Sequence, residues 1–222
     1  MSFRDKIDAY LENRPWPDYG ISLALDSVVD RKAKYRERDF LPDYLAIELD
    51  RAQVLDTNGQ YMPLVANTVP FYKGLEAVEP PPFLLRPIAI MGILALLSLF
   101  FSYREDKRKK PYYGLNKTIF FIGGIMGVVL AFLWFGTEHS VPAWNYNLLW
   151  LWPTHIVMAW FIRPHAPTWV RYYYLASGVV VLGILGGFAF FPQDFHLAFI
   201  PMMVILSSRS LGLFFQMTAQ EK

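Results

Sequence analysis

The sequence contains no cysteine among its 222 residues. This absence excludes disulfides, thiolate metal sites and a cysteine nucleophile from these residues. The opening segment MSFRDKI is charged and lacks the apolar core of a secretory signal peptide. A basic stripe with interleaved polar residues is also missing, which argues against a nucleic-acid partner.

Net charge is low as well, because the formal value for the whole chain is only +2. This small sum hides two unlike halves. Residues 1–82 hold ten Lys and Arg against fourteen Asp and Glu, whereas residues 83–222 hold eleven against five. An acidic, hydrophilic region is therefore followed by a basic and apolar one.

Long apolar stretches fill the second half. A helix needs about 20 mostly apolar residues to cross the hydrocarbon core of a membrane. Five such stretches in succession are hard to fit in one water-soluble core, so the sequence predicts a mainly α, membrane fold with a five-helix domain over residues 83–222. Arg86 and Arg209 lie where a long side chain can extend to the interface. The predicted spans are residues 83–103, 118–137, 145–162, 172–191 and 195–215.

The connections between these spans differ in charge. The first is strongly basic and the third holds Arg163 and Arg171, whereas the second and fourth carry Glu138 and Asp194. Short basic loops stay in the cytoplasm. We therefore expect the N-terminal region outside and the C-terminus in the cytoplasm. The residues expected to set this topology are Arg104, Lys107, Arg108, Lys109 and Lys110.

Small residues recur at four-residue spacing in two of the spans. Gly123, Gly127 and Ala131 form one such series, and Gly183 and Gly187 form another. Small residues on one helix face let the backbones of membrane helices approach closely. Helix packing is the favoured interpretation, and a substrate cleft is the alternative.

Residues 1–82 predict a small α+β region outside the membrane. Helices are expected over residues 4–13 and 42–54, the second capped by Asp39, and a strand is expected over residues 64–72. A core of this size is marginal by itself. We therefore interpret the region as part of a larger periplasmic domain.

The motif PWPDYG at residues 15–20 is expected to end the first helix. Export of a hydrophilic region of this length normally needs a signal sequence ahead of it. Because residues 1–7 offer none, we expect the natural polypeptide to begin upstream of Met1 or to use a separate export route.

Polar residues collect at the expected outer face of the membrane. One interpretation is a mouth that orients a lipid headgroup or ester. The alternative is structural, with Asn145 as a helix cap and Asp194 favourably placed at a helix N-terminus. The candidates for facing substrate or lipid are His139, Asn145, Asn147, His155, Asp194 and His196.

His155 lies ten residues after Asn145 and hence about 15 Å along a helix, near the middle of the bilayer. Ionisable side chains at that depth usually face a bundle interior or a cavity. A neutral imidazole hydrogen-bonded to a neighbouring helix is the favoured interpretation. The histidines lack the spacing of a metal or haem site, so no metal and no cofactor is predicted.

Several motifs follow one another along the chain. They are residues 4–7, 15–21, 30–31 and 40–45 in the first half, and 137–139, 145–150 and Pro153 in the second. Their order and spacing resemble the Lnb-type lipoprotein N-acyltransferase family, whose members join a periplasmic papain-like domain to C-terminal membrane helices. The resemblance implies transfer of an acyl group from a phospholipid, through a thioester on a cysteine, to the N-terminal amine of a lipoprotein at the bacterial inner membrane.

The chain departs from the family at the catalytic residues. The family cysteine precedes the stretch that matches Arg4 and Asp5, and its histidine lies further upstream, so no catalytic residue is predicted here. We expect the membrane-embedded part of an Lnb-like acyltransferase. The alternative is a non-catalytic integral subunit of a larger membrane complex. The expected partners are membrane lipids, and lipoproteins or other membrane subunits.

Overall fold

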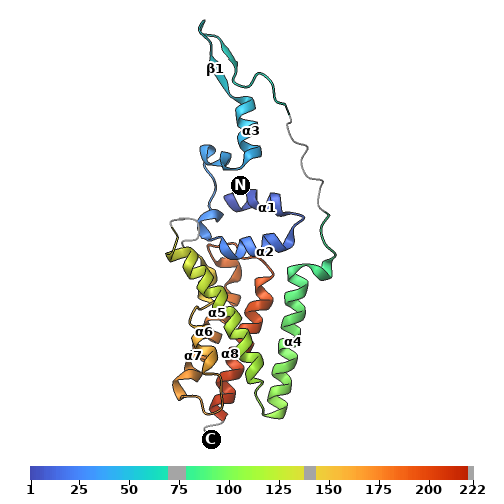
Figure 1. Ribbon diagram of the computed structural model, residues 1–222, viewed down its shortest axis with the longest axis vertical. Coiled ribbons are helices and arrows are strands. Elements are labelled where there is room, and N and C mark those ends of the chain that lie inside the picture. The colour runs from blue at the N-terminus through green and yellow to red at the C-terminus, as the bar shows by residue number, and fades with distance from the viewer. Residues whose placement is uncertain (70–78, 138–143, 220–222) are drawn as a thin grey trace.

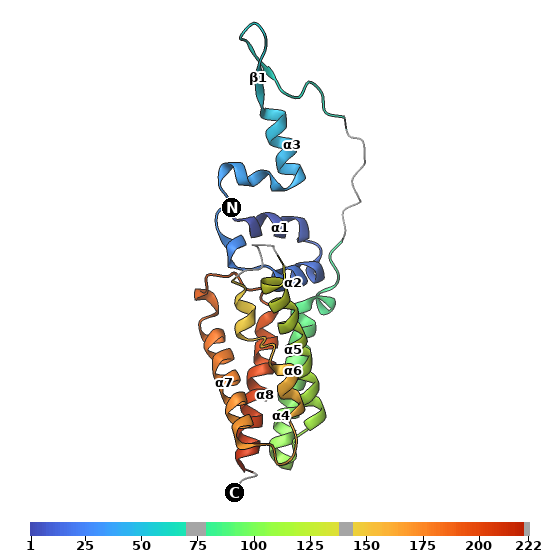
Figure 2. The same cartoon turned by 60° about the vertical axis from the view of Figure 1, so that its left-hand side comes forward.

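A computed structural model describes residues 1–69, 79–137 and 144–219 of the chain. Long helices run side by side in a bundle, and short helices and a hairpin extend from one end of it (Figure 1, Figure 2). We call this end of the bundle, across which helix α2 lies, the capped end. The far end is the opposite one, where α4 and α8 finish.

Within the described residues, four helices are long and apolar enough to cross a membrane. They are α4 (Pro87–Arg108), α5 (Tyr113–Phe135), α7 (Thr168–Gly186) and α8 (Phe199–Ala219). Helix α4 begins at a proline, which suits the first helical position because that residue needs no amide partner. Four of the five predicted spans are therefore confirmed as helices.

The third predicted span, residues 145–162, is not a continuous helix, and the expectation of one unbroken helix there was wrong. The segment consists of a 3-10 turn, η4 (Tyr146–Leu149), and a short helix, α6 (His155–Trp160). Pro153 has no amide to donate to the carbonyl oxygen of Leu149. The indole nitrogen of Trp152 donates to that oxygen instead, at 2.7 Å. The proline and this substitute bond together explain the break.

Helix α5 comes very close to the broken segment. A Cβ atom added to Gly127 would lie 2.2 Å from the carbonyl oxygen of Leu151, and one added to Gly124 would lie 2.4 Å from the amide nitrogen of Ile156. The predicted packing role of Gly127 is confirmed, and Gly124 is a second close contact. Irregular backbone at membrane depth is tolerated when protein covers it, and here α5 provides that cover.

Helix α8 packs between α4 and α7. Close approach to α7 again depends on a glycine, because a Cβ atom added to Gly178 would lie 2.9 Å from the side chain of Leu211. One added to Gly183 would meet nothing within 4 Å, so its predicted packing role finds no contact among the described residues. The buried core of the bundle includes Phe120, Trp150, Tyr174, Phe199 and Met203.

The N-terminal region is mainly helical. It contains α1 (Phe3–Leu11), α2 (Pro15–Ala24), η1 (Ser27–Asp30), η2 (Tyr35–Phe40) and α3 (Pro42–Arg51), followed by an antiparallel hairpin of β1 (Gln53–Leu55) and β2 (Tyr61–Pro63). Short 3-10 turns, η3 (Phe83–Leu85) and η5 (Phe188–Phe190), flank two membrane helices.

Three local predictions for this region need correction. The PWPDYG motif ends the first helix but also begins α2, because Pro15 occupies its first position. Leu41, not Asp39, is the N-cap of α3. The predicted strand over residues 64–72 is absent from residues 64–69, and residues 70–72 lie outside the described part of the chain.

Candidate functional site

Amide side chains fasten α2 to the bundle. Asn145 donates from Nδ2 to the carbonyl oxygens of Leu23, at 2.8 Å, and Ala24, at 3.1 Å. Asn147 donates to the same oxygen of Leu23 at 3.1 Å. The last carbonyls of a helix lack partners within it, so these two buried amides satisfy the C-terminal end of α2.

Asn145 also has the capping role that was expected of it. Its Oδ1 accepts from the backbone nitrogen of Asn147 at 2.9 Å, which caps η4 instead of a long membrane helix. The Oδ1 of Asn147 in turn accepts from the indole of the buried Trp150 at 3.0 Å. Both asparagines are therefore fully engaged in joining α2 to the broken segment.

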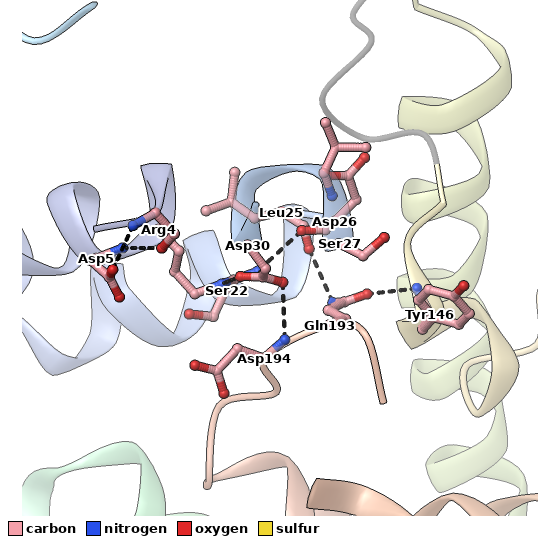
Figure 3. Close-up of polar contacts among 12 residues, drawn as sticks. Arg4, Asp5, Ser22, Leu25, Asp26, Ser27, Asp30, Tyr146, Gln193 and Asp194 are labelled. Atoms are coloured by element: carbon pink, nitrogen blue, oxygen red, sulfur yellow. Dashed lines mark hydrogen bonds and ion pairs between the residues drawn. The ribbon is translucent and has the colours of Figure 1, made fainter. Parts of the chain in front are cut away.

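Gln193 is a third amide side chain that joins the end of α2 to the bundle, a region here called the junction, and sequence reasoning missed it. Its Oε1 accepts from the backbone nitrogen of Tyr146 at 2.7 Å, and its Nε2 donates to the carbonyl oxygen of Leu25 at 3.1 Å (Figure 3). The side chain is 1% exposed. A single glutamine after Pro192 carries no sequence signal of burial, because its partners are backbone groups distant in the chain.

An ion pair links α1 to η1, and its carboxylate also contacts the segment that leads into α8. Arg4 pairs with Asp30 and donates from Nη2 to the carbonyl oxygen of Asp26 at 3.3 Å. Asp30 also accepts from the backbone nitrogen of Asp194 at 2.9 Å (Figure 3). The adjacent Arg31 pairs with Glu37 instead, at 2.7 Å, and its hydrogen bonds lower the pKa of Glu37 to about 2.

A cavity of about 370 Å³, here called the junction pocket, lies between α1, α2, the start of α4 and residues 194–197. It lies at the boundary between the N-terminal region and the bundle. Apolar side chains, including Ile88, Phe195 and Leu197, line part of it. Its charged or titratable lining consists of Arg4, Asp8, Asp18, Arg86, Asp194 and His196.

Negative charge dominates around Asp8. Burial, the largest cause, and the nearby carboxylates of Asp18 and Asp194 together raise the pKa of Asp8 to about 6, against the opposing effect of Arg4. In the same pocket the Nε2 atom of His196 lies 3.6 Å from Oδ2 of Asp18. Grouped carboxylates that raise one another's pKa are frequent at functional sites.

The predicted candidates fall in different places. Asp194 and His196 line the junction pocket, whereas Asn145 and Asn147 lie in the adjacent junction. His139 lies outside the described residues. The structure therefore brings together four of the six candidates at the capped end, and His155 is separate from them.

His155 begins α6 and is fully buried. Its Nδ1 lies 2.7 Å from the hydroxyl of Tyr173 on α7, and the rings of Trp152 and Phe120 pack against it. The favoured interpretation, a hydrogen bond to a neighbouring helix, is confirmed. Its Nε2 finds no hydrogen-bond partner within the described part of the chain.

Arg209 does not extend to an interface, and that expectation was wrong. Its side chain is 1% exposed and pairs with Glu105 of α4 at 2.6 Å. It also donates to Ser98 Oγ at 2.9 Å and to Asn116 Oδ1 at 3.3 Å. The predicted span ended at residue 103, so Glu105 was expected in a loop. Helix α4 instead continues to Arg108, and the carboxylate of Glu105 is buried in the bundle.

The residues expected to set the topology lie at the far end of the bundle. Arg104, Lys107 and Arg108 belong to the last turns of α4, Lys109 is its left-handed C-cap, and Lys110 follows. The connection between α6 and α7 lies at this end too, as does the end of α8 at Ala219 (Figure 1). The orientation of the chain in the membrane stays a prediction.

Comparison with known proteins identifies a family for the membrane half of the chain. The model of the Lnb transmembrane domain matches residues 79–221, which include every helix from α4 to α8. No curated protein and no solved structure matches the chain. The match and the four long apolar helices together make this an integral membrane protein.

Proposed function

The chain belongs to the Lnb transmembrane-domain family, and we propose that it forms the membrane-embedded part of an Lnb-type acyltransferase, which acts on lipoprotein N-termini with a phospholipid donor. The family match carries this proposal, because it spans the whole bundle. We further propose that the capped end faces the periplasm of a bacterial inner membrane, since the basic residues lie at the far end.

The geometry of the capped end supports the proposal. Acyl transfer from a phospholipid to a lipoprotein brings together two substrates that are both anchored in the membrane. Their reacting groups meet at the membrane surface, and the junction pocket lies where the bundle meets α1 and α2. Its lining combines apolar side chains with charged ones, as an amphipathic substrate requires.

The covalent step needs a nucleophile from elsewhere. A thiolate splits acyl transfer into two easier steps, but these 222 residues contain no cysteine. We therefore assign to this chain the binding and orientation of substrates, and we assign the thioester to a cysteine outside these residues.

The test is deletion of the gene in its native host, followed by mass spectrometry of lipoprotein N-terminal peptides. We expect these peptides to change from N-acylated to free-amine forms, and we expect a plasmid copy to restore acylation. Unchanged acylation, with the protein co-purifying at fixed stoichiometry in a larger assembly, would favour the non-catalytic subunit instead.

A further inference from the structure

We propose that the junction pocket binds a primary ammonium group that has an oxygen acceptor nearby and is carried by a lipid-anchored molecule. Two sources share this chemistry at a membrane surface: the headgroup of phosphatidylethanolamine and the free N-terminus of a lipoprotein. The first is a phospholipid, the class of the proposed donor, and the second is the proposed acceptor, so the inference rests on the proposed function and assigns a binding site for its substrates. Binding needs no nucleophile, so it can be tested apart from acyl transfer.

The three carboxylates of the pocket favour a cation, although Arg4, Arg86 and His196 also line it. Asp8, Asp18 and Asp194 come from three separate segments, α1, α2 and the lead into α8. Figure 3 shows Asp194 with its backbone nitrogen toward Asp30 and its carboxylate turned the other way. Burial is the largest cause of the raised pKa of Asp8, and the negative charges of Asp18 and Asp194 add to it because they disfavour a further carboxylate beside them. A bound ammonium would relieve that repulsion.

A second, independent feature indicates an acceptor on the same ligand. Arg4 also lines the pocket, is 4% exposed, and has one guanidinium nitrogen, Nη1, with no hydrogen-bond partner among the described residues. A buried donor without a partner is costly. A phosphate or carbonyl oxygen close to the ammonium would supply the missing acceptor. Phosphoethanolamine and an aminoacyl terminus both carry such an oxygen.

The pocket suits an ammonium better than a metal ion. Among the described residues, no three His, Asp or Glu side chains lie close enough together to hold a metal. The pocket volume of about 370 Å³ instead falls in the range of small-molecule sites.

Primary and quaternary ammonium groups are recognised differently. A primary ammonium donates hydrogen bonds from its three N–H groups, and a carboxylate of the pocket can accept one of them. Choline sites rely on several aromatic faces, whereas the described lining offers one phenyl ring, Phe195. We therefore expect selection for ethanolamine over choline headgroups.

The apolar part of the lining indicates how such a ligand reaches the pocket. Ile88 lies in the first turn of α4, and Leu197, which is 64% exposed, precedes α8. Both mark the outer ends of membrane helices. A lipid-anchored molecule can therefore place its polar head in the pocket while its acyl chains stay beside the bundle.

The experiment measures binding to the purified full-length protein by native mass spectrometry. The lipid arm compares dioleoyl phosphatidylethanolamine, phosphatidylcholine and phosphatidylglycerol. The peptide arm compares a diacylated lipopeptide with a free amine and its N-acetylated form. We expect the ammonium-bearing member of at least one arm to bind about tenfold more tightly than its comparators. The arm that shows selectivity identifies the source.

Two variants assign this selectivity to the pocket. Asp18→Asn and Asp194→Asn each remove one charge, and the second keeps the backbone link from residue 194 to Asp30. We expect both to reduce the selectivity about fivefold or more. Asp106→Asn, at the far end, is the matched control and should leave it unchanged. Thermal unfolding in detergent checks that each variant is folded.

Equal binding of all lipids together with equal binding of both lipopeptides would overturn the inference. So would selectivity that survives both pocket variants. Neither result depends on acyl transfer. If the deletion host loses acylation but the purified protein shows no selectivity for an ammonium group, the proposed function stands and only the pocket assignment is refuted.

Discussion

At the scale of single residues, the Arg209–Glu105 pair is the most consequential feature inside the bundle. Both side chains are almost fully buried, and the guanidinium also reaches Ser98 and Asn116. Removing one member of a buried pair leaves an uncompensated charge. We expect Arg209→Leu to lower the free energy of unfolding in detergent by about 3–5 kcal/mol.

The double variant Arg209→Leu with Glu105→Leu tests this explanation. It should regain much of the lost stability, because no lone charge remains. Lys109→Ala removes an exposed ion pair with Asp106 at the same end and should have little effect. A double variant no more stable than Arg209→Leu alone would contradict the electrostatic explanation.

Asp8 should make stability depend on pH. Its pKa is raised from 3.8 to about 6 by burial and by Asp18 and Asp194, with Asp5 adding to the effect and Arg4 opposing it. Between these two values the folded state binds more protons than the unfolded state, so stability falls as pH rises from about 4 to about 6.

We expect Asp8→Asn to flatten this dependence, measured as the thermal unfolding temperature across the same pH range. Asp106→Asn serves as the control and should retain the slope of the parent protein. If the Asp8→Asn variant followed pH as steeply as the parent, the assignment to Asp8 would be wrong.

At the scale of elements, the contact between α5 and the broken third segment leaves the least room beside any glycine that the structure describes. Gly127→Ala would force a Cβ atom to within 2.2 Å of the Leu151 carbonyl oxygen. Overpacking of this kind costs about 1–3 kcal/mol. We therefore expect a lower unfolding temperature for Gly127→Ala.

Gly183→Ala is the matched control, because its added Cβ atom meets nothing within 4 Å. It should unfold at the temperature of the parent protein or slightly above it. Equal stability of the two variants would mean that α5 and the third segment do not pack as closely as described.

The break in that third segment shows that hydrophobicity predicts which residues lie in the membrane but not whether their helix is continuous. The stretch is as apolar as a spanning helix, so its composition predicts one. Pro153 then removes one amide, and the indole of Trp152 takes over its acceptor, the Leu149 carbonyl oxygen. Whether such a proline kinks a helix or interrupts it depends on a neighbouring element, here the glycine face of α5.

At the scale of the whole molecule, charge is distributed unequally between the two ends of the bundle. The cysteine-free sequence allows single labelling sites to be placed at will. We expect Asn58→Cys, in the hairpin turn beyond the capped end, to react with a membrane-impermeant maleimide on intact spheroplasts. Lys109→Cys, at the far end, should react only after the membrane is opened. The reverse pattern would show that the proposed orientation is inverted.

The sequence alone determined which segments are apolar enough to lie in a membrane and where basic charge gathers. Both are properties of short stretches, so four of the five predicted spans were found as helices. It also carried the motifs of the family to which the chain belongs.

Only the tertiary structure decided which polar residues meet. Arg209 pairs with Glu105, which is 104 residues away in the sequence, and Gln193 donates to Leu25, which is 168 residues away. The pKa of Asp8 is raised by burial and by carboxylates on other segments. Such partners are selected by helix packing, because a buried polar group must be satisfied by whatever the fold places beside it.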